Sequence, residues 1–210
     1  VHDAGTTPSG APFYVMRKIG GRPLEDLVGQ RGGLAERLAL LPHIVASAHA
    51  LAHAHARGVV HRDVKPSNIL VGDLGETILI DWGLAKAIGE PEPEAEPRLA
   101  PVYEDDSDLI KTRAGVVFGT PGFMAPEQLR GAPADERCDV YALGATLYHL
   151  LARRPPHYAK TAGEMMVAAA RGPAQPVRER VSGVPPELAT IVDKALAYDR
   201  EERYHDARAL

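Results

Sequence analysis

Four closely spaced polar residues have the chemistry that phosphoryl transfer requires: Asp63, Lys65, Asn68 and Asp81. The Asp63 carboxylate can accept a proton from an attacking hydroxyl, and the Lys65 ammonium can face the transferring phosphate. Asn68 and Asp81 offer oxygen ligands of the kind that Mg²⁺ prefers. These residue types therefore predict one site in which a base, a cation and two metal ligands act on a phosphate.

The chain between Asn68 and Asp81 is predicted to form a β-hairpin. Two short apolar runs, residues 69–71 and 77–80, flank a glycine-bearing turn at residues 72–76. Such runs around a turn are typical of paired antiparallel strands. Because a hairpin returns the chain on itself, it brings Asp81 back beside Asn68, where both side chains can hold one metal ion.

The same stretch carries a recognisable motif pair, HRDVKPSN at residues 61–68 and DWG at residues 81–83. It resembles the catalytic loop and the metal-binding loop of protein kinases, whose patterns are H-R-D-L-x-x-x-N and D-F-G. Two residues depart from these patterns, since Val64 replaces Leu and Trp82 replaces Phe. Lys65 is the choice typical of the serine/threonine-specific members.

Three later segments extend the resemblance. Residues 119–127, GTPGFMAPE, look like the end of a kinase activation segment. Residues 139–144, DVYALG, look like the start of the buried helix on which the kinase C-lobe is built, and Arg203 matches the arginine that pairs with Glu127 in the family. The residues in these segments resemble those of bacterial serine/threonine kinases. The implied fold is α+β and kinase-like: a mostly helical C-lobe with short β-hairpins and little of the N-lobe.

The resemblance implies ATP and Mg²⁺ as cofactors and a role for each motif residue. Asp63 would orient the serine or threonine hydroxyl of a protein substrate, while Lys65 would neutralise charge on the γ-phosphoryl group. Asn68 and Asp81 would hold magnesium, and Thr120 would brace Asp63 and Lys65. Leu70 would pack beneath adenine, with Met16 as gatekeeper and Arg17 and Ile19 in the linker that meets the nucleotide. The structural residues of the motifs are His61, which is expected to be a packed core histidine, Trp82, Gly83, Glu127, Asp139 and Arg203.

Regulation is expected in the activation segment. The resemblance places an activating phosphothreonine at Thr112, with Arg62 as its receiver, because a guanidinium binds phosphate in a bidentate fork. A homodimer would allow this autophosphorylation. Residues 89–108 are rich in acidic residues and proline, so they are expected to form a disordered insert. That insert is either a solvated loop or a regulatory or docking element.

The residues before the hinge strand, residues 13–16, lack two parts of a complete kinase. Residues 1–12 contain neither a G-x-G-x-x-G loop nor the strand lysine that pairs with phosphate. With a start at Val1 and a stop at Leu210, we expect residues 1–210 to be a partial kinase domain, made of the hinge and the C-lobe and inactive by itself. Its hinge strand, without neighbours, would expose an apolar edge.

Two other functions remain open at this stage. The chain could be a non-catalytic pseudokinase or a kinase-derived scaffold, although a pure scaffold has no need of metal ligands. It could also be a small-molecule phosphotransferase of kinase-like fold. Lys65 and the Ala-Pro-Glu motif at residues 125–127 favour a protein substrate instead.

Composition excludes several classes of protein. With 24 basic and 28 acidic residues, the net charge of −4 favours neither nucleic acid nor an anionic membrane as a partner. The single cysteine, Cys138, excludes an intrachain disulfide and a cysteine-based zinc site, which favours a cytoplasmic protein. The most apolar stretch, residues 38–56, is interrupted by Pro42 and four histidines, so no membrane span is expected.

Helices are expected over much of the remaining chain. Apolar spacing and helix-ending residues predict them at residues 23–28, 34–57, 134–151, 162–170 and 185–197. The helix at residues 134–151 is apolar nearly all round, as a central helix should be. His43, His49, His53 and His55 lie without an acidic partner in the second of these helices, so we interpret them as helix-surface residues rather than metal ligands.

Overall fold

The computed structural model describes residues 3–15, 18–89, 111–112, 115–116 and 119–210. The helices are α1 (Leu24–Gln30), α2 (Leu34–Leu38), α3 (Leu41–His55), α4 (Pro126–Leu129), α5 (Glu136–Ala152), α6 (Ala162–Arg171), α7 (Val177–Arg180) and α8 (Pro186–Ala195). The strands are β1 (Asp3–Thr6), β2 (Pro12–Val15), β3 (Arg22–Pro23), β4 (Val59–Val60), β5 (Ile69–Val71), β6 (Thr77–Leu79), β7 (Lys86–Ala87), β8 (Lys111–Thr112) and β9 (Gly115–Val116). Helices dominate and the strands form small separate sheets, which agrees with the α+β expectation.

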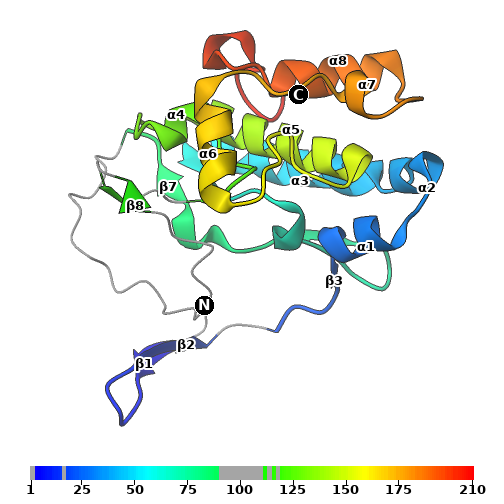
Figure 1. Ribbon diagram of the computed structural model, residues 1–210. Coiled ribbons are helices and arrows are strands. Elements are labelled where there is room, and N and C mark those ends of the chain that lie inside the picture. The colour runs from blue at the N-terminus through cyan, green and yellow to red at the C-terminus, as the bar shows by residue number, and fades with distance from the viewer. Residues whose placement is uncertain (1–2, 16–17, 90–110, 113–114, 117–118) are drawn as a thin grey trace.

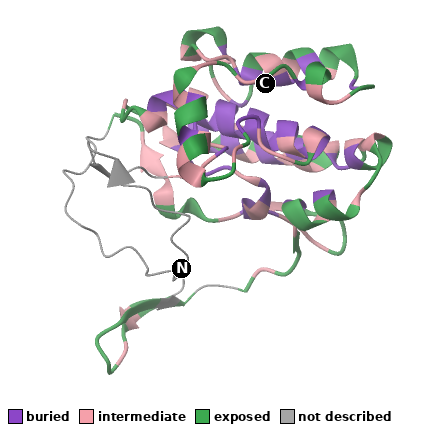
Figure 2. Cartoon of the chain, viewed as in Figure 1, coloured by how far each residue is buried: buried purple, intermediate pink, exposed green. Residues whose placement is uncertain are grey.

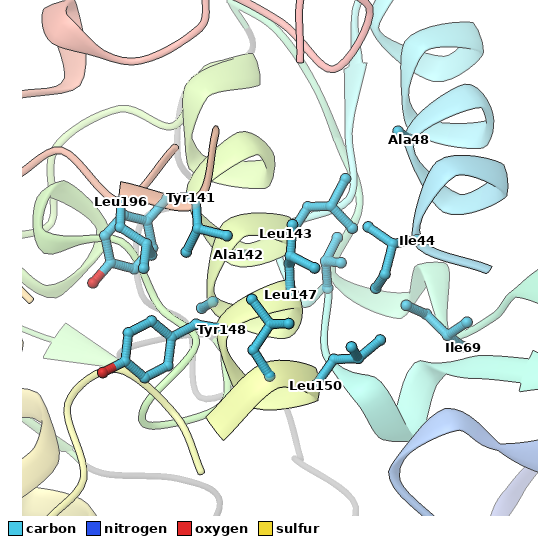
Figure 3. Packing of buried hydrophobic residues seen from close by; sticks show 14 of the residues in the cluster. Ile44, Ala48, Ile69, Tyr141, Ala142, Leu143, Leu147, Tyr148, Leu150 and Leu196 are labelled. Atoms are coloured by element: carbon cyan, nitrogen blue, oxygen red, sulfur yellow. The ribbon is translucent and has the colours of Figure 1, made fainter. Parts of the chain in front are cut away.

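Helix α5 is the centre of the hydrophobic core, as its apolar sequence predicted. Helices α2, α3, α7 and α8 all pack against it, and Figure 2 shows buried residues concentrated along α3 and α5. In Figure 3, Ile44 and Ala48 of α3 and Ile69 of β5 lie on one side of α5, while Tyr141 and Tyr148 of α5 point to the other. A helix buried on several sides gives a rigid base for the loops that contact it.

The prediction of one helix over residues 34–57 is wrong, because the chain breaks between α2 and α3. Pro42 lies in the first turn of α3, where a missing backbone N–H costs nothing. Inside a continuous helix its ring would clash with the carbonyl of Leu38, four residues earlier. Leu38 is the last residue of α2, so the helix ends where the proline requires it to end.

The predicted hairpin between Asn68 and Asp81 is present. Strands β5 and β6 pair antiparallel with Ile69 opposite Leu79 and Val71 opposite Thr77. Strand β3 adds to the free edge of β5, and α1 packs against β3 and β5. A second small pairing joins β4 to β7. Because β4 precedes the loop at residues 61–68 and β7 follows the loop at residues 80–85, these two pairings hold the two loops side by side.

The start of the described chain forms a separate hairpin of β1 and β2. It lies apart from the helical body in Figure 1, and Phe13 and Val15 of β2 are 42% and 45% exposed. The hinge strand was expected to lack neighbours, but β2 does have one partner strand. Met16, Arg17 and nearly all of the predicted insert at residues 89–108 lie outside the described residues. Within the described ranges, no helix combines the length and apolar character needed to cross a membrane.

Candidate active site

A buried carboxylate on α5 fixes the turn that precedes Asp63. Asp139 accepts hydrogen bonds from the backbone N–H groups of His61 at 2.7 Å and Arg62 at 2.8 Å. Arg62 has a φ of 70°, in the left-handed region that costs a non-glycine residue about 1–2 kcal/mol. The two hydrogen bonds to one carboxylate hold this strained turn in place. Asp139 is fully buried, so the anchor is shielded from water.

The His61 ring connects the two loops of the site. Its Nε2 lies 3.0 Å from the carbonyl oxygen of Ile80, and its Nδ1 lies 3.3 Å from the backbone nitrogen of Asp63. A carbonyl can only accept and an N–H can only donate, so these partners assign a neutral ring with its hydrogen on Nε2. His61 is fully buried. It therefore packs in the core and links the two loops, in agreement with the expectation of a core histidine.

Three polar side chains converge on the Asp63 carboxylate. The Thr120 hydroxyl donates to Oδ1 at 2.8 Å, and the Lys65 ammonium lies 3.0 Å from Oδ2. Lys65 also donates to the Thr120 hydroxyl at 2.6 Å, so the three groups close a triangle. Asn68 completes the cluster by donating from its amide nitrogen to the Asp63 backbone oxygen at 2.9 Å and to Oδ2 at 3.2 Å. Asp63 is 8% exposed, which strengthens these charge-assisted interactions.

Asn68 and Asp81 are brought together at the open end of the hairpin. The backbone N–H of Ile80 donates to the carbonyl of Asn68 at 2.9 Å, which places Asp81 one residue beyond that link. Asp81 has φ 62° and ψ 64° and is exposed. A Cβ at Gly83 would lie 3.2 Å from the Asp81 Oδ1, so a larger residue at that position would crowd the carboxylate.

Trp82, which departs from the family pattern, is held on two sides. Its indole Nε1–H donates to the carbonyl of Leu79 at 3.1 Å. Its ring packs on that of His61 with centroids 4.5 Å apart and a tilt of 58°. The next turn is fixed as well, because the Arg62 Nε–H donates to the carbonyl of Leu84 at 2.8 Å.

A buried ion pair lies beneath the segment that carries Thr120. Arg203 donates two hydrogen bonds to the Glu127 carboxylate, at 2.6 and 2.8 Å. The Arg203 guanidinium also lies 4.8 Å from the centre of the Tyr141 ring. These contacts tie α4 to α5 and to the end of the chain. They give the segment at residues 119–127 a fixed support.

The comparison with known families agrees with this geometry. A family model described as the protein kinase domain matches residues 10–210. The chain belongs to the protein kinase domain family. The predicted resemblance and the kinase-like α+β fold are thereby confirmed.

Three bacterial relatives show the same family. The chain is 35% identical to serine/threonine-protein kinase PknB of Mycolicibacterium smegmatis over 211 residues, which cover 99% of this chain and 31% of that protein. It is 38% identical to serine/threonine-protein kinase PknD of Protochlamydia amoebophila over 217 residues, 94% of this chain and 21% of the relative. A probable serine/threonine-protein kinase of Corynebacterium efficiens is 34% identical over 200 residues, 93% and 28% respectively. The chain thus spans less than a third of the length of these relatives.

The donor set of this kinase domain fits a magnesium ion. Both hydrogen bonds that Asn68 makes to Asp63 use its amide nitrogen, so its amide oxygen is the atom that could bind a metal ion. Asp81 supplies an exposed carboxylate from the neighbouring loop. The described residues contain no group of three or more His, Cys, Asp or Glu side chains suited to a metal ion. Waters and substrate phosphates would complete the coordination, as is usual for Mg²⁺.

The remaining predicted residues lie in different parts of the fold. Leu70 is half-buried in β5, opposite Pro23 of β3. Ile19 is half-buried in the segment between β2 and β3. Met16 and Arg17 lie outside the described residues, and Thr112 is described only through its backbone in β8. The structure therefore leaves their predicted roles untested.

Two contributors to the site were missed in the sequence. His55 is buried rather than on the helix surface, and its Nε2 contacts Asp139 at 3.0 Å while its Nδ1 accepts the backbone N–H of Ala207 at 3.3 Å. Its position continues the buried stripe of α3 at helical spacing, a signal that could have found it. Gln128 donates to the carbonyl of Arg62 at 3.3 Å, and no sequence signal marks that contact.

Proposed function

We propose that this chain is the catalytic part of a serine/threonine protein kinase that transfers the γ-phosphoryl group of ATP to a hydroxyl of a protein substrate. One observation carries the proposal. The Asp63 carboxylate is held at once by the Thr120 hydroxyl at 2.8 Å, the Lys65 ammonium at 3.0 Å and the Asn68 amide at 3.2 Å. A buried carboxylate oriented by three groups is arranged to act as a positioned base, because its geometry is set before the substrate arrives.

In this mechanism Asp63 accepts the proton of the substrate hydroxyl. The hydroxyl oxygen forms a bond to the γ-phosphorus while the bond from that phosphorus to its bridging oxygen breaks, so ADP leaves with the bonding electrons. Lys65 lies beside Asp63 and stabilises negative charge on the transferring group. Thr120 holds both side chains, so it keeps the base and the cation at a fixed separation.

Magnesium and ATP are proposed to bind beside the Asp63 cluster. Asn68 and Asp81 would hold Mg²⁺, which when bound neutralises charge on the phosphate oxygens. His61 sets the relation of the two residues, because it bonds the loop of Asp81 at Ile80 and the loop of Asn68 at Asp63. Leu70 and Ile19 are proposed to contact adenine.

The proposal extends to regulation by phosphorylation of the activation segment. Thr112 would be phosphorylated by a second copy of the kinase in a transient homodimer, and Arg62 would receive the phosphate. Mass spectrometry of the autophosphorylated protein should find the modified Thr112 peptide.

The single cysteine, Cys138, is buried, and burial raises the pKa of its thiol well above the usual value. A cytoplasmic location is proposed because the single cysteine leaves residues 1–210 without an internal disulfide, as suits a reducing compartment.

Replacement of the proposed base tests the function. In the full-length protein, Asp63→Asn should lower kcat by roughly 10²–10⁴ while leaving ATP affinity nearly unchanged, since Asp63 faces the acceptor hydroxyl. Asp73→Asn is the matched control, because Asp73 is an exposed aspartate on the turn of the hairpin. Full phosphoryl transfer by the Asp63 variant would refute the assignment. ATP binding without any transfer by the unchanged protein would favour the scaffold function instead.

A further inference from the structure

Side chains hold the proposed metal-binding loop at three backbone carbonyls, those of Leu79, Ile80 and Leu84. The Trp82 indole donates to Leu79 at 3.1 Å, His61 lies 3.0 Å from the carbonyl of Ile80, and Arg62 donates to Leu84 at 2.8 Å. Two of these donors come from the catalytic loop. Trp82 is the exception, because it lies in the loop that it holds.

The indole hydrogen bond spans Asp81. It joins the side chain of Trp82 to the carbonyl of Leu79 and so closes a short loop of which Asp81 is a part. Asp81 has a left-handed backbone, φ 62° and ψ 64°, which is uncommon outside glycine, although aspartate adopts it more readily than most residues, and which local contacts help to hold. A phenylalanine at position 82 could stack on His61 but has no N–H to donate. The tryptophan therefore adds a constraint on Asp81 that the usual family residue cannot supply.

We propose that Trp82 is a positioning residue whose indole N–H keeps Asp81 in the conformation that offers its carboxylate beside Asn68. The inference rests on the proposed function, in which Asp81 holds magnesium. Trp82 acts through Asp81 and through the tilted contact with His61, 4.5 Å between ring centres. Removal of the indole hydrogen bond releases one end of the loop, and Asp81 then spends more time in backbone conformations that cannot bind the metal.

The composition of the chain makes this proposal directly measurable. Trp82 is the single tryptophan, so its indole gives one N–H resonance and the whole intrinsic tryptophan fluorescence of residues 1–210. The hydrogen bond predicts that the indole N–H exchanges with solvent more slowly than that of a free indole, in protein without metal or nucleotide. Exchange at the rate of a free indole would overturn the proposal, whatever the enzyme activity.

Two variants separate the hydrogen bond from the ring. Trp82→Phe removes the donor and part of the ring, whereas 3-benzothienylalanine at position 82 keeps the bicyclic shape and replaces N–H by sulfur. In both, amide exchange in the loop should be about 3- to 10-fold faster than in the unchanged protein, the effect of losing one ordinary hydrogen bond. The amide of Ala85, which donates to the Trp82 carbonyl at 3.0 Å, is a suitable reporter. Unchanged exchange in the benzothienyl variant would overturn the role of the N–H.

Nucleotide binding gives a readout that a purely structural residue would not move. In the full-length protein, both variants should bind ADP in the presence of Mg²⁺ about 3- to 10-fold more weakly, while the affinity for ADP without Mg²⁺ stays the same. Equal weakening with and without Mg²⁺ would overturn the link to Asp81. Failure of the proposed function would instead be seen as unimpaired phosphoryl transfer by Asp63→Asn, a separate measurement.

Discussion

The carboxylate of Asp139, at the start of the central helix, accepts the backbone N–H of His61 at 2.7 Å across 78 residues of chain. The same oxygen lies 3.0 Å from the Nε2 of His55, and the other oxygen accepts the N–H of Arg62. One buried side chain of the core therefore sets the backbone from which Asp63 projects. The position of the proposed base depends on α5 as much as on its own loop.

Asp139→Asn should weaken both the fold and the site. An amide would turn its NH₂ group toward one set of N–H donors, so at least one buried donor would lose its partner. We expect a loss of about 2–5 kcal/mol in the free energy of unfolding and a lower kcat. Urea unfolding followed by circular dichroism measures the first, with Asp199→Asn as an exposed control. Unchanged stability would show that Asp139 does not anchor the turn.

Thr120 should matter through its hydroxyl rather than its shape. Thr120→Val keeps the branched side chain but removes both the donor to Asp63 and the acceptor for Lys65, whereas Thr120→Ser keeps both. We expect roughly a 10- to 100-fold fall in kcat for the valine variant and less than about a 3-fold change for serine, because a neutral hydrogen bond contributes about 1 kcal/mol and one to a charged group about twice that. Steady-state kinetics on one peptide substrate compares them. Equal activity of the two variants would contradict the bracing role.

Asp81→Ala should weaken Mg²⁺-dependent nucleotide binding more than Asn68→Ala. A carboxylate brings a full negative charge to the metal, whereas an amide oxygen brings only a dipole. Calorimetric titration of ATP with and without Mg²⁺ measures both losses. Without metal, both variants should bind ATP as the unchanged protein does. If both keep undiminished binding in Mg²⁺, neither residue belongs to the metal site.

His149 on α5 should make the fold sensitive to acid. Its ring lies 5.9 Å from that of Phe123, and its Nδ1 is buried without a hydrogen-bond partner among the described residues. Burial lowers the pKa of His149 from 6.5 to about 4. The unfolded chain therefore takes up this proton first as the pH falls, so the stabilisation from the neutral ring is complete above pH 6.5 and is lost between pH 6.5 and about 4.

His149→Phe tests this pH dependence while keeping a ring against Phe123. The unfolding free energy of the unchanged protein should fall relative to the variant by roughly 1–3 kcal/mol between neutral pH and pH 4, since one pKa unit corresponds to about 1.4 kcal/mol. Burial also lowers the pKa of His157 and His43, so some acid dependence should remain in the variant. A stability difference that does not change with pH would contradict the prediction.

The local elements of this protein could be predicted from its amino-acid sequence. The hairpin of β5 and β6 could be predicted because its strands and its turn are contiguous, and short-range spacing decides such a unit. The motif spacing placed Asp63, Lys65 and Asn68 on one loop for the same reason. Where a local rule was overlooked, the prediction was wrong: Pro42 in the apolar stretch required the break between α2 and α3.

How these local elements contact one another depends on the tertiary structure. Lys65 contacts Thr120 across 55 residues, and Arg203 binds Glu127 across 76. The family resemblance named these partners, but no pattern in the residues shows the closed triangle around Asp63. The burial of His55 against Asp139 shows the same limit, since an exposed-looking histidine became an anchor once α3 packed on α5. The physical reason is that the energy of such contacts depends on distance and burial, which arise only when the helices pack together.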